Sequence, residues 1–472
     1  MSKRPWFLGA VALIIHAGLF AQRSSSVNSY PTAGNLWVGA KGSCTRSATP
    51  VAYNAATACG SMQAAQTAAQ GGDTVIILDG TYSNQTISSG QKTSAVSYYA
   101  QTPSSCYGNP AKATTCTGTV LLGSGNATGL ANQTVLEIDI DHVHVYGVVS
   151  NGSGEGRGAL AIGVGTAGTD VIVSGFGGKN AWIPSDGVTV ENSEFGGFNA
   201  CIGFTPGTGC ASNSNCAIED VFRFWGMGSA APQNDKLLNS AIHDLSAPPD
   251  GVCGSSNLEP HADLMQVYQS SGTAQNIVVD GNLFYNANGD SNMQWGGGGL
   301  QNITIQNNYF GNAQCCNGIA FGQASPCSGL IVRNNVIDWV GYDIINNGSC
   351  SGSIDISNNI ILHPLPTGCL VSGGTVTGGN NIFPPGSPTC GSSVKTCTPN
   401  WLNGPPSSAN GFDLRLSSSD ACAKGAGNTT DFAPTDFYGT LRSSSSVDIG
   451  AFQTSSGSAS VAPPTNLAAI VN

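Results

Sequence analysis

Charged residues are scarce in this chain of 472 residues, where Asp, Glu, Lys and Arg together make up 9%. Only 16 residues are Lys or Arg against 27 that are Asp or Glu, so the formal net charge is −11. An acidic protein repels a polyanion at long range, which argues against a nucleic-acid partner. An anionic polysaccharide would need a bridging cation or a local basic patch. The composition also disfavours charged, solvated helices, and 64 Gly residues indicate many short turns.

Long apolar runs are missing after the N-terminus, so no later stretch predicts a membrane span. The N-terminus has Lys3 and Arg4, an apolar run of about 15 residues that ends at Phe20, and small Ala21. This order predicts a secretory signal peptide over residues 1–21, and therefore a secreted protein, extracellular or periplasmic. The alternative is an uncleaved anchor, which the short run disfavours because a span needs about 20 residues.

Zinc-type spacing is missing as well, because the 16 Cys include no C-x-x-C pair. That number of Cys fits disulfides formed in an oxidising compartment. The pairs that are close enough in sequence to close local loops are Cys44/Cys59, Cys106/Cys116, Cys201 with Cys210 or Cys216, and Cys390/Cys397. The complete connectivity does not follow from the sequence.

A repeat runs through the second half of the chain. Its units are short alternating strands, each followed by Asn and another apolar pair, as in NIVVDGNLF from Asn276 and NITIQNNYF from Asn302. The aligned Asn residues are 26, 27, 24 and 22 residues apart and are Asn282, Asn308, Asn335, Asn359 and Asn381. A second column, spaced by 28, 26, 25 and 25 residues, consists of Gln266, Gln294, Ala320, Ile345 and Leu370. A fixed period of this size indicates a solenoid.

The alternation within each repeat assigns one set of side chains to the interior. The inward set is Ile277, Val279, Ile303, Ile305, Leu330, Val332, Ile354 and Ile356. The Asn column should form an internal ladder of amides that bond the backbone of neighbouring coils. Long helices and hairpin signals are absent from this region. The sequence therefore predicts an all-β fold, a single-stranded right-handed parallel β-helix whose coils are stacked in parallel.

Two segments, one before and one after the repeats, resemble pectate-lyase-like β-helix proteins of the secreted bacterial type. SMQAAQTAAQGGDTVIILDGTYSNQTI, Ser61 to Ile87, is similar to their opening, and the resemblance implies an N-terminal capping helix followed by a buried strand. VDIGAF at Val447 resembles their closing segment. The predicted organisation is a signal peptide at 1–21, an N-terminal extension at 22–60, the β-helix at 61–453 and a disordered Ser/Gly/Pro-rich tail at 454–472.

A candidate site follows the one large interruption of the period, Ala247 to Pro260. Long loops on a rigid scaffold often carry binding sites. The next segment, EPHADLMQVYQ, holds His261, Asp263 and Gln266 in an H-x-D-x-x-Q arrangement that resembles one found in secreted β-helix proteins. By parity Gln266 projects outward, and such amides bond sugar hydroxyls. The residues expected to bind substrate are Gln266, Gln294, Trp295 and Asp290.

The coil before this segment supplies further ionisable groups. NDKLLNSAIHDLSAPPD contains Asp235, Lys236, His243 and Asp244, and Arg223 precedes it. Because stacking converts one period of sequence into proximity, these groups are expected to share one face with His261, Asp263 and Asp290. The simpler alternative is that Asp263 caps a turn and that His261 is a packing residue.

Two reactions suit such a site. In β-elimination a base removes the proton next to a uronate carboxyl while a cation neutralises that carboxyl. The predicted catalytic residues are His261, Asp263, Lys236, His243 and Arg223, and the predicted ligands of a calcium ion are Asp235, Asp244 and Asp263. In glycoside hydrolysis two carboxyl groups about 5–9.5 Å apart would act. Asp263 with Asp290 or Asp244 would be that pair.

Known enzyme motifs are missing, which leaves the function open at the level of the sequence. The chain has no W-x-D-H segment as in common pectate lyases, and no Asp-Asp, Gly-His-Gly and Arg-x-Lys set as in polygalacturonases. The favoured expectation is a monomeric, secreted polysaccharide lyase that acts on a uronate-containing polysaccharide. One alternative is a non-catalytic protein of the cell surface or matrix that binds glycans. A second alternative is a glycoside hydrolase, since fold does not fix function.

Overall fold

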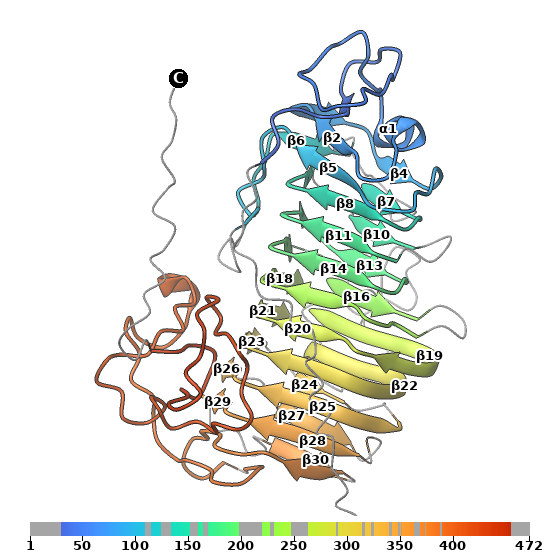
Figure 1. Cartoon of the computed structure of the whole chain (residues 1–472). Coiled ribbons are helices and arrows are strands. Elements are labelled where there is room, and N and C mark those ends of the chain that lie inside the picture. Colours follow the sequence, from blue (N-terminus) through green and yellow to red (C-terminus); the bar gives the residue numbers. More distant parts are fainter. Residues whose placement is uncertain are drawn as a thin grey trace, which may run out of the picture.

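The strands of this protein stack coil upon coil, and every strand pairing in the ladders is parallel (Figure 1). The structure is a computed structural model that describes residues 30–108, 115–123, 134–151, 159–163, 169–197, 220–226, 231–246, 263–288, 291–313, 317–321, 325–338, 342–347, 350, 352–362, 369–372, 374–387 and 389–454. The predicted signal peptide, His261, Asp290 and nearly all of the predicted tail lie outside these residues. Three ladders of parallel strands run along the stack, and we name them A, B and C in the order in which the chain passes through them within each coil from β4 onward.

Ladder A is the first. Its strands are β4 (Gln85–Ile87), β7 (Leu136–Ile138), β10 (Leu160–Ile162), β13 (Ala181–Ile183), β16 (Phe222–Trp225), β19 (Met265–Gln275), the start of β22 (Ser291–Gln306), β24 (Asn317–Ala320), β27 (Tyr342–Asn347) and β30 (Cys369–Ser372).

Ladder B comes next in each coil. It consists of β1 (Leu36–Val38), β2 (Thr74–Ile77), β5 (Val96–Ala100), β8 (Val143–Tyr146), β11 (Val171–Ser174), β14 (Val188–Glu191), β17 (Lys236–Leu238), β20 (Val278–Asp280), the end of β22, β25 (Cys327–Arg333), β28 (Ser353–Ser357) and β31 (Thr375–Thr377).

Ladder C completes the coil. It consists of β3 (Gly80–Tyr82), β6 (Val120–Leu122), β9 (Val149–Ser150), β12 (Gly177–Gly178), β15 (Glu194–Gly196), β18 (Ala241–Ser246), β21 (Leu283–Asn288), β23 (Tyr309–Ala313), β26 (Val336–Asp338) and β29 (Ile360–Ile361). The long strand β22 pairs in ladder A at its start and in ladder B at its end, which joins those two ladders into one sheet. The predicted all-β parallel β-helix is confirmed.

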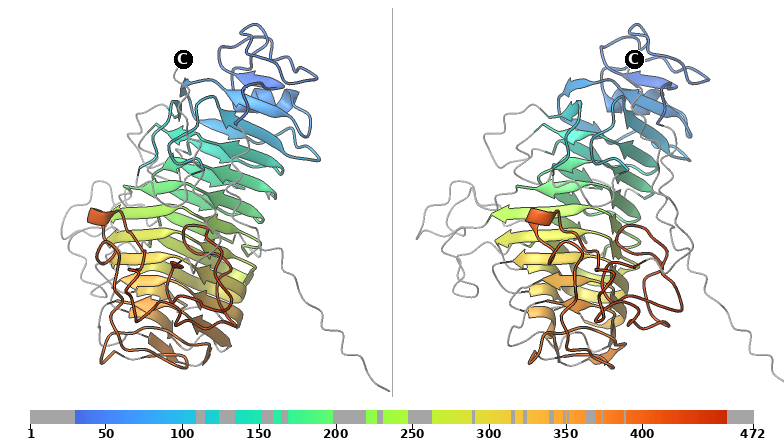
Figure 2. Two further views of the ribbon diagram at one scale, coloured as in Figure 1. Left: turned by 60° about the vertical axis from the view of Figure 1, so that its left-hand side comes forward. Right: turned by 90° about the vertical axis from the view of Figure 1, so that its left-hand side faces the viewer.

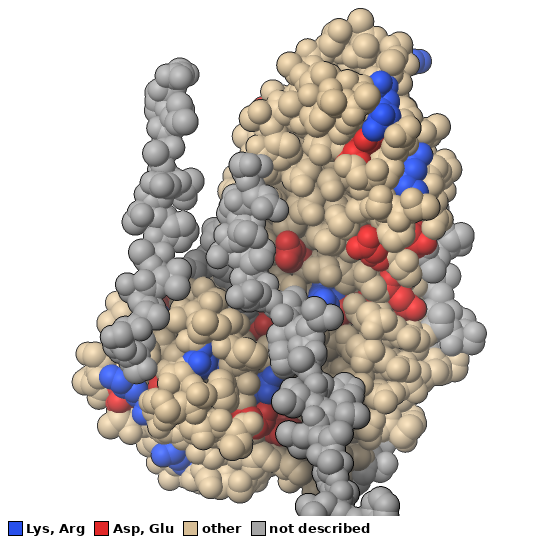
Figure 3. Space-filling model, viewed as in Figure 1, with Lys and Arg blue, Asp and Glu red and all other residues tan. Residues whose placement is uncertain are grey.

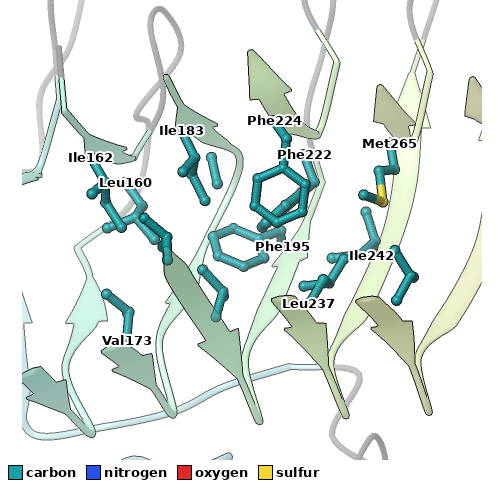
Figure 4. Packing of buried hydrophobic residues seen from close by; sticks show 14 of the residues in the cluster. Leu160, Ile162, Val173, Ile183, Phe195, Phe222, Phe224, Leu237, Ile242 and Met265 are labelled. Carbon is teal, nitrogen blue, oxygen red and sulfur yellow. The ribbon is translucent and has the colours of Figure 1, made fainter. Parts of the chain in front are cut away.

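The interior of the stack is apolar because alternate side chains of all three ladders point into it. Figure 4 shows Phe195 of β15, Phe222 of β16 and Leu237 of β17 projecting into one shared core. All eight side chains that parity assigned to the interior, from Ile277 to Ile356, are buried. Full burial of one such side chain stabilises the fold by about 1.5–3 kcal/mol, so each coil adds several of these contributions.

The predicted asparagine ladder is present at the corner between ladders B and C. Asn335 is typical: its Oδ1 accepts from the backbone N–H of Asn308 at 2.9 Å, and its Nδ2 donates to the carbonyl of Ile305 at 3.0 Å. The ladder of amides runs from Asn282 to Asn381. Toward the N-terminus Ser240 takes the next position, where its hydroxyl oxygen accepts from the backbone N–H of Ser193. Every coil of this region is therefore bonded to the next through a buried side chain.

A second, outer asparagine column precedes the first by one residue and was not foreseen. Asn334 and Asn358 have φ values of 54° and 58°, a left-handed conformation that Asn tolerates better than most residues. Their side chains point away from the core and bond the last part of the chain: Asn334 Nδ2 donates to the carbonyl of Gly450 at 3.2 Å, and Asn358 Nδ2 donates to that of Asp431 at 2.9 Å.

The last part of the chain, residues 389–454, folds back along the stack, and we call it the C-terminal segment. Figure 2 shows it, in orange and red, lying over the outside of the later coils. Its Phe412, Leu414 and Phe437 form a second apolar core with the outward side chains of ladder C, among them Leu283 and Val336. The short helix η2 (Ser408–Asn410) lies within it. The later strands of ladder C therefore carry buried apolar side chains on both faces.

The N-terminal part contains the predicted helix as α1 (Met62–Ala68), with Ser61 as its N-cap. Met62, Ala65 and Gln66 of α1 are buried, and the Tyr98 hydroxyl donates to Gln66 Oε1 at 2.7 Å. Strand β1, from the predicted extension, adds to ladder B beyond β2. Because β1 also covers this end, the role of α1 as the cap stays a prediction.

Five disulfides join described residues. They are Cys44–Cys59, Cys106–Cys116, Cys327–Cys350, Cys369–Cys390 and Cys397–Cys422. The first two were predicted. The predicted Cys390/Cys397 pair is wrong, because Cys390 joins the last coil of ladder A and Cys397 joins a later part of the C-terminal segment. Among the described residues no helix is long and apolar enough to cross a bilayer.

Candidate functional site

Polar and aromatic side chains gather on the outer face of ladder A at β16, β19 and β22. Since Phe222 and Phe224 point inward, the alternate residues Arg223 and Trp225 point outward. Arg223 is in register with Gln266, and Gln266 with Gln294. Three residues predicted for the site are therefore direct neighbours on successive coils.

A second outward column runs beside the first and holds the aromatic groups. Trp225 is in register with Tyr268, and their rings stack with centroids 4.7 Å apart at an interplanar angle of 28°. The Arg223 guanidinium also lies over the Trp225 ring, with its Cζ 4.6 Å from the ring centroid. On the coil after Tyr268 this register position is Gly296, which carries no side chain.

The face extends one coil toward the N-terminus through Trp182, which occupies the register position before Arg223. We define the ladder A face as Trp182, Arg223, Trp225, Gln266, Tyr268 and Gln294. All but Gln266, which is 7% exposed, are partly exposed. Because neighbouring strands lie about 4.8 Å apart, the four coils of this face span roughly 14 Å.

Arg223 is held by a buried carboxylate beneath it. Its Nε and Nη2 both lie 2.8 Å from Asp220 Oδ2, and the other oxygen of Asp220 accepts from the backbone N–H of Asp263 at 2.7 Å. Asp220 thus fixes the guanidinium and ties β16 to the start of β19. Nη1 of Arg223 has no partner in the part of the chain that the structure describes. It is the donor that a ligand could reach.

Lys236, His243 and Asp244 lie on other ladders, so the structure does not bring them together with the outward residues of ladder A. Lys236 projects from β17 in ladder B, between Thr189 and Val278. His243 and Asp244 belong to β18 in ladder C. One coil crosses three ladders, and proximity through stacking holds only for residues of the same ladder. His261 and Asp290 fall outside the described residues.

His243 is bound between two carboxylates on ladder C. Its Nδ1 lies 2.7 Å from Asp244 Oδ2 and its Nε2 lies 3.0 Å from Glu194 Oε1, while its ring stacks on Tyr285 at 4.8 Å. Gly196 makes room, because a Cβ there would lie 2.3 Å from His243 Cε1. Burial alone would lower the pKa of His243, but the hydrogen bonds to Asp244 and Glu194 outweigh it and raise the pKa to about 9.

Two further assignments are corrected by these positions. With its pKa raised to about 9, His243 is protonated at neutral pH, and a protonated imidazole cannot accept a proton as a general base. Trp295 was expected to bind substrate, but it is fully buried and stacks on Phe321 in the core, with ring centroids 6.1 Å apart. Its parity is that of inward Val267, its register partner.

The three predicted calcium ligands do not converge. Asp235 precedes a strand of ladder B, is buried, and accepts from the backbone N–H of Val188 at 2.9 Å. Asp244 is paired with His243 on ladder C, and Asp263 precedes β19 of ladder A. Within the described ranges no group of three or more His, Cys, Asp or Glu is arranged to hold a metal ion. Calcium binding by this chain stays a prediction, but Asp235, Asp244 and Asp263 do not form one site for it.

Electrostatics on the visible surface follow from the sparse charge. Figure 3 shows isolated acidic and basic groups on a face that is otherwise uncharged, apart from the grey part.

Sequence reasoning missed the aromatic residues of the ladder A face, which are Trp182, Trp225 and Tyr268. The signal was available, since Trp225 and Tyr268 each follow by two residues a predicted site residue on a strand.

Comparisons with known proteins find similar solved structures but no family. The chain matches no model of a protein family and no curated protein sequence. It is similar to pectate lyase Pel9A, with 15% identity and a TM-score of 0.45 over 91% of this chain and 98% of that one. It is also similar to the PL6 family alginate lyase AlyGC, with 14% identity and a TM-score of 0.27 over 74% of this chain and 55% of that one.

A third similar structure is the catalytic unit of a thermostable GH87 alpha-1,3-glucanase from Streptomyces thermodiastaticus, with 13% identity and a TM-score of 0.28 over 71% of this chain and 65% of that one. Of the alginate lyase named above, this chain spans little more than half the length. The parallel β-helix itself rests on the strand pairing of the three ladders.

Proposed function

We propose that this chain is a secreted, carbohydrate-active protein that binds a uronate-containing polysaccharide along the ladder A face. The observation that carries the proposal is the Arg223 guanidinium, stacked on Trp225 and in register with Gln266 and Gln294. Arg suits carboxylates because its planar fork matches them. Aromatic rings pack against the apolar faces of sugars, and amides bond their hydroxyls. Five disulfides support the secreted location.

The reaction we propose at this face is β-elimination. Arg223 would hold the uronate carboxylate and stabilise the charge that develops on it, as fixed donors do in other active sites. A base would take the proton next to that carboxylate, the electron pair would form a carbon–carbon double bond, and the glycosidic oxygen would leave. His261 is the proposed base, since it precedes Asp263 by two residues and Asp263 bonds the Asp220 that holds Arg223.

The test of the proposal is a panel of pectic, alginate and glycosaminoglycan polymers beside neutral glucans. We expect binding to the uronate polymers and an ultraviolet absorbance from the unsaturated product, measured with calcium and then with chelator. Binding without product would favour the non-catalytic alternative. Reducing ends released from neutral glucans, with no affinity for any uronate polymer, would contradict the proposal and favour a hydrolase.

A further inference from the structure

Two carboxyl groups meet where the C-terminal segment lies against ladder B. Asp355 projects outward from β28, and Asp431 belongs to the C-terminal segment. The Ser357 hydroxyl donates to Asp355 Oδ1 at 2.6 Å. Arg333, from β25 on the preceding coil, donates through Nη1 to Asp431 Oδ1 at 2.8 Å. The Arg333 side chain is 11% exposed and that of Asp431 22%, so water screens this cluster only in part.

The cluster has more acceptors than donors. The second oxygen of Asp431, Oδ2, is buried and accepts no hydrogen bond from the described residues. The neighbouring carboxyl group with which Asp431 interacts is that of Asp355, which is also an acceptor when ionised. Two carboxylates beside a single guanidinium repel each other, and a buried acceptor without a donor destabilises the folded state. One proton between the two carboxyl groups removes both penalties.

We propose that a proton shared by Asp355 and Asp431 latches the C-terminal segment to ladder B, and that the segment loosens locally when this proton is lost. The charged and titratable groups that face the pair are Arg333 and the two carboxyls themselves, with Ser357 as a neutral donor. Arg333 Nε is already engaged with Gln306 Oε1 at 3.0 Å. Among the described residues, Arg333 is thus the one cation that acts on the pair, and it cannot neutralise two negative charges.

The titration of the two groups fits this arrangement. Burial, followed by the neighbouring Asp431, raises the pKa of Asp355 to about 6. Burial opposes ionisation of Asp431 too, but its neighbours Asp355 and Ser357 and the Arg333 charge lower its pKa. A raised folded pKa means that the Asp355 contribution to stability is complete below its unfolded pKa of about 4 and is lost as pH rises through about 6.

The Asp431 contribution has the opposite sign, since its lowered pKa gives stability that is lost as pH falls. The latch should therefore hold best near pH 4, where Asp355 keeps its proton and Asp431 is ionised, and it should loosen over the range in which pH rises through about 6. Neutral bonds stay in place above that range, such as the one from Asn358 Nδ2 to the Asp431 carbonyl at 2.9 Å. The expected response is local opening around Asp431 rather than release of the whole C-terminal segment.

Hydrogen exchange on the full chain tests the latch. Protection factors of amides around Asp431, corrected for intrinsic exchange, are measured at about pH 5 and about pH 8 in the wild type and in Asp355→Asn. We expect a fall of about tenfold or more in the wild type, since one pKa unit corresponds to tenfold. Asp355→Asn should lose the fall, because its amide donates to Asp431 at every pH.

Two further variants make the result decisive. Asp431→Asn, whose amide can donate to Asp355, should also remove the pH dependence, and it serves if Asp355→Asn does not fold. Asp413→Asn, which removes a carboxylate paired with Arg415 elsewhere in the C-terminal segment, should leave the fall around Asp431 intact. The proposal is overturned if the wild type shows equal protection at both pH values, or if either variant at the pair keeps the fall.

Discussion

Ladders A and C have the same strand spacing and the same alternation, but their outer faces differ in what covers them. The outer face of ladder C carries Leu283, Val336 and Ile360, which are buried under Phe412 and Phe437 of the C-terminal segment. The ladder A face carries an arginine, glutamines and aromatic rings that stay partly exposed. One ladder therefore contributes to stability on both of its faces, whereas the other is free to contact a ligand.

The comparison is most strongly tested by deleting an aromatic ring from the cover of ladder C. Phe437→Ala should lower the free energy of unfolding by about 3–5 kcal/mol, because it removes a buried ring and leaves a cavity. Leu441→Ala is the matched control, since Leu441 lies in the same segment but is 69% exposed, and it should cost almost nothing. Denaturant titration measures both. Equal effects of the two variants would show that the C-terminal segment is not packed on ladder C.

The inner asparagine ladder should come next in size. Asn335→Ala leaves the backbone N–H of Asn308 and the carbonyl of Ile305 buried without partners, at a cost of about 2–4 kcal/mol. Asn276→Gly serves as control, because Asn276 is exposed and has a φ of 55° that Gly adopts freely. Its side chain bonds only two other exposed side chains, those of Asn234 and Asn302. A loss below about 1 kcal/mol for Asn335→Ala would contradict a buried role.

A smaller effect is expected from pH on ladder C. Because the pKa of His243 is raised to about 9, its contribution is complete below the usual histidine pKa of about 6.5 and is lost as pH rises through about 9. Thermal melting should show a loss of at most about 3 kcal/mol over that range in the wild type, since one pKa unit corresponds to about 1.4 kcal/mol. His243→Gln, which keeps hydrogen-bonding capacity without titrating, should show less of it. An identical pH profile for this variant would remove His243 from the account.

The smallest change in stability is expected on the ladder A face. Tyr268→Ala loses one stacked pair with a partly exposed ring, so the free energy of unfolding should fall by about 1 kcal/mol. The same variant should bind uronate polymers more weakly. A loss as large as that of Phe437→Ala would mean that Tyr268 is part of the core, which would remove the contrast between the two ladders.

Parity and period were enough to predict the fold, because every second residue of a strand faces the core and is therefore apolar. Ile277 and Val279 were placed inside and Asn282 in a ladder for that reason, and the structure agrees. The same rule places Trp295 inside with Val267, although the size and polarity of its ring suggested a ligand contact. Where parity and residue type disagreed, parity was correct.

The candidate site was predicted only in part, because one coil turns twice between its three ladders. Lys236 and His243 are seven residues apart, but the corner at Asn239, with φ 49°, puts them on different faces. The sequence shows that such a corner exists without showing which way the chain leaves it. Arg223, Gln266 and Gln294 came together because they share one ladder and one phase of the repeat.

The most direct test of the central claim compares two cations on neighbouring ladders. Arg223→Gln on ladder A and Lys236→Gln on ladder B each remove one positive charge, and calorimetry measures their affinity for a pectic or alginate polymer after circular dichroism confirms folding. We predict that Arg223→Gln weakens binding about 10- to 100-fold, as expected for a lost hydrogen bond to a charged group, and that Lys236→Gln changes it little. Equal losses in both variants, or none in Arg223→Gln, would contradict a uronate-binding ladder A face.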